Sequence, residues 1–125
     1  MQVPILKQGG YLIATIQSAL SDADLLQFRD ELVGRVGQFR SRGVVIDVTV
    51  LDVIDSFSVR TLRAVVHMLK LRGAETVIVG IQPDVAIAMV QLGVTLENEA
   101  TALDLEEGLV HLDQVTGSSG RHGRW

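Results

Sequence analysis

Two runs of β-branched residues constrain the fold of this chain more than any other feature. The segments VVIDVTV (44–50) and TVIVGI (76–81) are almost continuously apolar, which is typical of strands covered on both faces. The segment between them has apolar residues at helical spacing. Because parallel neighbours in a sheet are joined by long crossovers, usually helices, this order predicts an α/β fold with a mainly parallel sheet.

Two shorter strand-like runs come first, VPILK (3–7) and YLIATIQ (11–17). The Gln8-Gly9-Gly10 turn between them predicts an N-terminal β-hairpin. A hairpin is antiparallel, so we expect a mixed, mainly parallel sheet with helices packed on it. The segment VTLEN (94–98) suggests a last short strand.

Four segments read as helices. The first spans about 21–43, with Ser21 or Asp22 as its cap, Gly43 as its stop and one buried stripe: Leu25, Phe28, Leu32, Val36 and Phe39. The second begins after Asp55 and ends near Arg72-Gly73. The third begins at Pro83, a residue suited to the first helical position, and ends at Leu92-Gly93. The fourth spans 101–112 with Thr101 as its cap.

Composition narrows the class of protein. The chain has 125 residues and no cysteine, which excludes thiolate zinc sites. Its formal net charge of −4 argues against nucleic-acid binding, because an acidic surface repels phosphate backbones. No apolar run approaches a membrane span, and the N-terminus lacks the pattern of a signal peptide. We expect one cytoplasmic domain over residues 1–116, followed by a flexible Gly/Ser-rich tail over 117–125.

The sequence DSFS (55–58) at the strand-to-helix corner raises the main functional question. On a wheel of about 100° per residue, Ser58 lies on the same side as the buried residues Leu62 and Leu69, whereas Ser56 faces water. Ser56 is either the N-cap of the helix or, if Asp55 takes that role, its first residue with an exposed hydroxyl.

A phosphate on an exposed Ser56 is physically reasonable. It would meet free N–H groups and the positive end of the helix dipole, with Arg60 one turn along. It would add a charge of about −1.5 to −2 to a corner that already holds Asp52 and Asp55. Such a charge would be tolerated by the fold and would repel an acidic or apolar partner.

A second apolar stripe lies roughly opposite the core side of this helix, at Phe57, Ala64, Met68 and Leu71. It is either covered by a neighbouring helix or forms a contact surface beside Ser56. The residues that we expect to bind a partner are Asp55, Phe57, Arg60, Arg63, Ala64 and Met68.

Catalysis and metal binding find little support. The chain has no Gly-x-Ser-x-Gly elbow, and His67 is three turns from Ser56 on the same helix, while His111 would need tertiary packing to approach it. His67, His111 and His122 share no ligand spacing. The acids Asp47, Asp52 and Asp55 resemble a receiver pocket, but the paired acids and the late lysine of a receiver are missing. We expect no enzyme activity, no metal and no cofactor.

The segment VVIDVTVLDVIDSFSVRTL (44–62) resembles the phosphoacceptor segment of STAS domains, the family of the anti-sigma factor antagonists. The stretches GIQPDVAIAMVQLGV (80–94) and EATALDLEEGL (99–109) are similar to the RsbS-type branch of stressosome scaffolds. The resemblance runs from Val3 to about Leu112. Many antagonists have glycines after the Asp-Ser pair, whereas this chain reads Phe57-Ser58-Val59-Arg60.

This resemblance implies a STAS fold and a non-enzymatic scaffold. Such scaffolds self-associate and co-assemble with RsbR-type STAS paralogues into a large complex that sequesters a serine/threonine switch kinase of the RsbT type. Phosphorylation of the serine that matches Ser56 releases the kinase to a stress-response pathway. The alternative is a free antagonist that binds an anti-sigma kinase one-to-one. Thr49 and Ser58 remain open as further acceptors.

Overall fold

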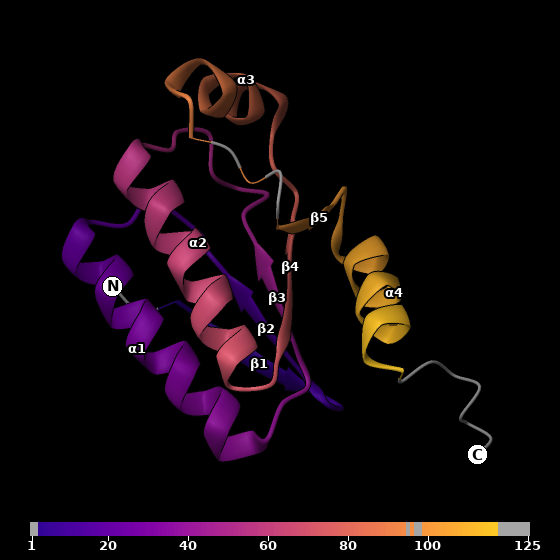
Figure 1. Cartoon of the computed structure of the whole chain (residues 1–125). Coiled ribbons are helices and arrows are strands. Elements are labelled where there is room, and N and C mark those ends of the chain that lie inside the picture. The colour runs from indigo at the N-terminus through magenta and orange to yellow at the C-terminus, as the bar shows by residue number, and fades with distance from the viewer. Residues whose placement is uncertain (1–2, 95, 97–98, 118–125) are drawn as a thin grey trace.

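A central sheet with the strand order β1-β2-β3-β4-β5 organises the part of the chain that the computed structural model describes, residues 3–94, 96 and 99–117 (Figure 1). The elements of this part are β1 Ile5–Gln8, β2 Tyr11–Thr15, α1 Asp22–Phe39, β3 Gly43–Asp47, α2 Ser56–Leu71, β4 Glu75–Val79, α3 Pro83–Leu92, β5 Ala100–Ala102 and α4 Leu105–Thr116.

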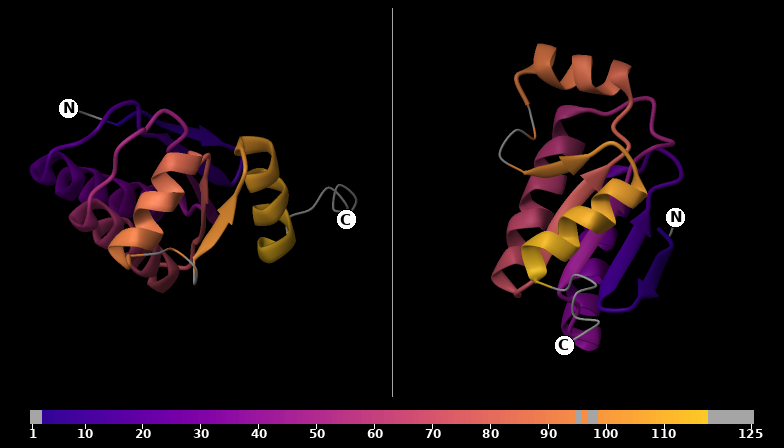
Figure 2. Two further views of the ribbon diagram at one scale, coloured as in Figure 1. Left: turned by 90° about the horizontal axis from the view of Figure 1, so that it is seen from above. Right: turned by 90° about the vertical axis from the view of Figure 1, so that its right-hand side faces the viewer.

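The sheet is mixed and mainly parallel. Strand β1 pairs antiparallel with β2, and β2 to β5 pair in parallel. Helices α1 and α2 cover one face and α4 covers the other, while α3 lies beyond the carboxyl ends of the strands (Figure 2). This confirms the single α/β domain and the N-terminal hairpin. It also places the start of α2 at the carboxyl end of the sheet, beside α3.

Both faces of the inner strands are buried, as their β-branched sequences predict. In β3, Val44 and Ile46 belong to the larger core under α1 and α2, while Val45 belongs to a smaller core that includes Val77 and Leu112 under α4. All five side chains are completely shielded from solvent. The period of two along each strand therefore supplies both hydrophobic cores.

Helix α1 begins as predicted and ends differently. The Ser21 hydroxyl accepts a hydrogen bond from the Asp24 N–H, and the Asp24 carboxylate accepts one from the Ser21 N–H. The expected stop at Gly43 is wrong, because Arg40 ends the helix in the left-handed conformation (φ 51°) and Gly43 is the first residue of β3. Phe39, expected in the core, is 38% exposed because it lies in the last turn, beyond the sheet.

The C-terminal third holds two further corrections. Pro83 and Gly93 do begin and end α3 as expected. The expected strand over 94–98 is not found at Val94 or Leu96, which bury their side chains without strand structure; the other three residues lie outside the described part. Strand β5 comes later and includes Thr101, so the cap of α4 is Asp104, whose carboxylate accepts the Glu107 N–H at 2.9 Å.

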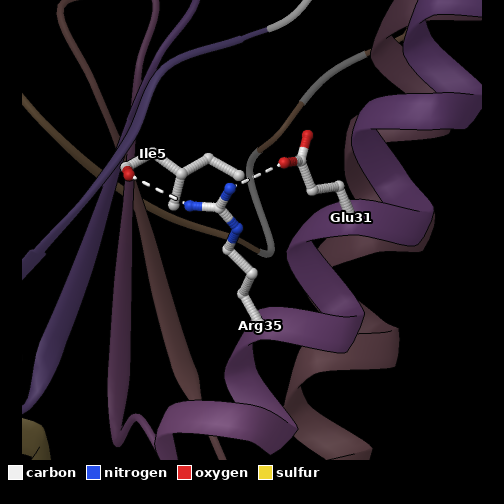
Figure 3. Close-up of polar contacts among 3 residues, drawn as sticks. All are labelled: Ile5, Glu31 and Arg35. Carbon is white, nitrogen blue, oxygen red and sulfur yellow. Dashed lines mark hydrogen bonds and ion pairs between the residues drawn. The ribbon is translucent and has the colours of Figure 1, made fainter.

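Arg35 joins helix α1 to the edge strand of the hairpin. Its Nη1 donates to the backbone oxygen of Ile5 at 3.3 Å, and its Nη2 binds Glu31 at 2.9 Å (Figure 3). The side chain therefore covers an acceptor on the strand at the rim of the sheet, a position that otherwise invites pairing with another chain.

No helix in the described ranges is long and apolar enough to cross a membrane. The expected flexible tail falls almost entirely on residues 118–125, which lie outside the described part.

Candidate functional site

The start of α2 settles which side chain is the cap. Asp55 has an extended backbone, and its Oδ1 accepts a hydrogen bond from the Ser58 N–H at 2.8 Å. Hydrogen bonds from the backbone N–H and then the hydroxyl of Ser58 hold the pKa of Asp55 below its usual value. Asp55 is therefore an ionised N-cap, the second of the two arrangements that the sequence allowed.

Ser56 becomes the first residue of the helix as a result. Its side chain is partly exposed, and its hydroxyl makes no hydrogen bond to any residue that the structure describes. The neighbouring hydroxyls differ, since that of Ser58 interacts with Asp55 and that of Thr49 donates to Asp47 at 2.6 Å. Of these three hydroxyls, Ser56 alone is not bound to a carboxylate.

The loop between β3 and α2, residues 48–55, is attached to the next loop along the sheet. The Val48 N–H donates to the Val79 oxygen at 3.0 Å, and the side-chain Nε2 of Gln82 donates to the Thr49 oxygen at 2.7 Å. Gly80 has a φ of +82°, and a Cβ there would overlap the Thr49 side chain. The sequence predicts a helix start at Pro83 and no role for the preceding Gln82 in the 48–55 loop, although glutamine is an unusual cap and for that reason a usable signal.

A small apolar pocket lies beside the capped corner. Its volume is about 90 Å³, and it lies between the start of α1 and the 48–55 loop, with Asp55, Ser58 and Leu62 among the residues that line it. This agrees with the predicted inward direction of Ser58.

The second apolar stripe of α2 is only partly covered. Phe57 is 39% exposed, Met68 37% and Leu71 88%, while Ala64 is half-buried. Helix α1 packs along α2 and α3 contacts it, yet neither covers these residues fully. The stripe therefore leaves apolar surface on the same helix as Ser56, which keeps the contact-surface interpretation open.

The basic side chains of α2 differ in their partners, and Lys70 in the last turn pairs with Glu75. Arg60, one turn after Ser56, is exposed and forms no ion pair with a described residue. Arg63 and His67 instead approach Glu99, whose side chain is only 3% exposed, at 4.0 Å and 3.2 Å. Glu99 does not stand out in the sequence, because a buried acid just before β5 cannot be distinguished there from a surface one.

No group of three or more histidine or acidic side chains lies close enough to hold a metal ion in the part of the chain that the structure describes. His67 binds Glu99, and His111 of α4 lines the same pocket as these two side chains without forming such a group with them. His122 lies outside the described part.

Comparisons with known proteins give this site a family context. Residues 2–108 match the family model of the STAS domain. Over 80 residues the chain is 30% identical to the RsbT co-antagonist protein RsbRA of Bacillus subtilis (strain 168). This stretch is 64% of the chain and 29% of that relative, so the chain spans less than a third of its length.

Two solved structures are similar over nearly their whole length. One is RsbS from Moorella thermoacetica, in a variant with glutamate in place of a serine: 35% identity, TM-score 0.81, 94% of this chain and 99% of that one. The other is described as the molecular architecture of the stressosome, a signal integration and transduction hub: 34% identity, TM-score 0.74, coverage of 90% and 97%. The chain belongs to the STAS-domain family and is similar to its RsbS-type stressosome members.

Proposed function

We propose that this protein is a stressosome scaffold that sequesters a serine/threonine switch kinase of the RsbT type and releases it when Ser56 is phosphorylated. The observation that supports the proposal is that two neighbouring residues have different roles at the start of α2. Asp55 caps the helix, which leaves the Ser56 hydroxyl without a bond to any described residue. A hydroxyl in that state is available to a kinase without loss of the cap.

The chemistry of the step is a simple phosphoryl transfer. The Ser56 oxygen bonds to the γ-phosphorus of ATP, the bond from that phosphorus to the β,γ-bridging oxygen breaks, and the serine proton passes to a base of the kinase. ADP leaves, and Ser56 carries about −1.5 to −2 charge. The new group lies at a helix N-terminus, beside the exposed Arg60, so the host fold tolerates it.

Release follows from the cost of keeping that charge in an interface. The surface next to Ser56 combines apolar groups, such as Phe57, with the carboxylates of Asp52 and Asp55. A partner docked there would have to strip water from a dianion without enough cations to replace it. Arg63 is held toward Glu99 and is less able to compensate.

The scaffold role rests on the relatives. The chain is similar to RsbS, to a chain of a stressosome structure and to part of an RsbT co-antagonist. We infer that it self-associates and co-assembles with RsbR-type STAS paralogues in the cytoplasm, and that it works without catalysis, metal or cofactor of its own.

The test is to incubate the purified protein with its cognate kinase and ATP and to map phosphate by mass spectrometry. We expect phosphate on Ser56, none in Ser56→Ala, and unchanged labelling of Ser56 in the matched variant Thr101→Ala, which removes an exposed hydroxyl of β5. Phosphate mainly on Thr49 or Ser58, or undiminished total labelling of Ser56→Ala, would overturn the assignment of the acceptor.

A further inference from the structure

Gln82 occupies the N-cap position of α3 but does not cap that helix. Its backbone is extended, and its side chain makes no hydrogen bond to the first turn of α3. The side chain instead reaches into the 48–55 loop, where Nε2 donates to the Thr49 oxygen at 2.7 Å. Gln82 therefore leaves its own helix without a side-chain cap and uses its side chain for the contact with the loop.

The backbone at residues 47–49, which we call the Thr49 corner, is held closely against the end of β4. Gly80 lies so close that any side chain there would overlap Thr49, and the Val48 N–H binds the Val79 oxygen at 3.0 Å. Within the corner, Asp47 accepts from both the N–H and the hydroxyl of Thr49, at 2.9 and 2.6 Å.

Beyond this corner the loop has fewer attachments. The Leu51 N–H binds the Val48 oxygen at 3.0 Å, and the next backbone or side-chain hydrogen bond within the described residues is the Asp55 cap itself. Leu51 is buried, whereas Asp52 and Val53 are exposed. The hydrogen bonds of the loop are therefore concentrated at the Thr49 corner and at the Asp55 cap, while Leu51 and Ile54 hold the stretch between them by apolar packing.

We propose that Gln82 is a positioning residue for phosphorylation of Ser56, because it attaches the 48–55 loop, which leads to Ser56, to the start of α3. The proposal rests on the function proposed above. Phosphoryl transfer depends on electrostatic stabilisation and on placing the attacking oxygen in line with the γ-phosphate, and a displacement of about 1 Å can cost about 100-fold in rate. Gln82 touches neither ATP nor the serine and acts only through the loop.

The variant Gln82→Met keeps the length of the side chain and removes its hydrogen-bond donor. With the cognate kinase, we expect kcat for Ser56 phosphorylation to fall about 10-fold while KM stays within about twofold, since docking surfaces remain and the oxygen is less well placed. The matched control is Gln27→Met, an exposed glutamine of α1 without a hydrogen bond to any described residue. It should leave both constants unchanged.

Hydrogen exchange on the free protein gives a second readout that needs no kinase. In Gln82→Met, the amides of Val48 and Leu51 should exchange about 10-fold faster, while amides in the middle of α1 should not change. An unchanged kcat, or a rise in KM alone, overturns the positioning role even if exchange changes. If the wild-type protein is not labelled on Ser56 at all, the proposed function fails, and unchanged exchange in Gln82→Met separately refutes the attachment of the loop.

Discussion

At the scale of single residues, one carboxylate determines which hydroxyl is available. Aspartate and serine are both good N-caps, and a shift of the helix start by one residue hardly changes the apolar pattern, so the sequence left Asp55 and Ser56 as alternatives. The structure gives the cap to Asp55 and leaves Ser56 outside it. The extended backbone of Asp55 makes it the cap, and this conformation cannot be read from the sequence.

The first prediction concerns this cap. Asp55→Ala should destabilise the protein by about 1 kcal/mol, and Asp55→Asn by less, because asparagine also accepts the Ser58 N–H. The pKa of Asp55 is lowered in the folded protein, so its contribution is present above the unfolded-state pKa and is lost as the pH falls through the folded-state pKa.

Urea denaturation at pH 7 and at pH 3 measures this directly. The difference in stability between wild type and Asp55→Asn should shrink on acidification. A difference that stays constant or grows would show that the ionised carboxylate does not stabilise the helix start.

The second prediction concerns the charge on the acceptor. Ser56→Asp places a carboxylate where the phosphate would be, and we expect a pull-down with the assembled complex to retain severalfold less kinase. The control Gln27→Asp changes the net charge equally on an exposed site of α1. Equal retention by both variants would count against charge as the cause of release.

Among the helices and strands, those features that depend on neighbouring residues alone were predicted correctly from the sequence. The strands β3 and β4, the Pro83 start of α3 and the Ser21 cap of α1 follow from propensity and capping chemistry. The errors occur where distant contacts decide. The αL conformation of Arg40 ends α1 before Gly43, and Thr101 pairs with Ile78 in the sheet instead of capping α4.

The third prediction uses two helical glycines with different surroundings. A Cβ on Gly108 of α4 would lie 2.6 Å from Val79 Cγ1 and 3.3 Å from Val77 Cγ1, so Gly108→Ala should cost about 1–3 kcal/mol by pushing α4 off the sheet. A Cβ on Gly34 of α1 would meet nothing within 4 Å, so Gly34→Ala should stabilise by about 0.5–1 kcal/mol. Thermal denaturation of the two variants checks the opposite signs.

In the whole molecule, the sheet brings three separate segments of the chain together at one end. Parallel pairing of β2 to β5 places three segments at the carboxyl ends of the strands: the 48–55 loop, the connection from β4 to α3 that contains Gln82, and the start of α1. The βαβ pattern in the sequence predicted the layers. It did not predict that Gln82 would reach Thr49, because that contact depends on how two loops 33 residues apart are oriented.

The fourth prediction separates the scaffold from the free antagonist. Mixed with an RsbR-type paralogue, the protein should sediment as a complex of far higher mass than either component. A chain that stays monomeric with its paralogue and binds the kinase one-to-one would support the antagonist instead.

Phosphate on Ser56 should release a captured kinase. This can be measured by loading the assembled scaffold with kinase, adding ATP, and following kinase release and Ser56 phosphate in the same sample. We expect release to rise in step with Ser56 phosphate, and we expect assemblies with Ser56→Ala to keep their kinase. Release from Ser56→Ala at the wild-type rate, or full retention by a scaffold fully phosphorylated on Ser56, would contradict this expectation.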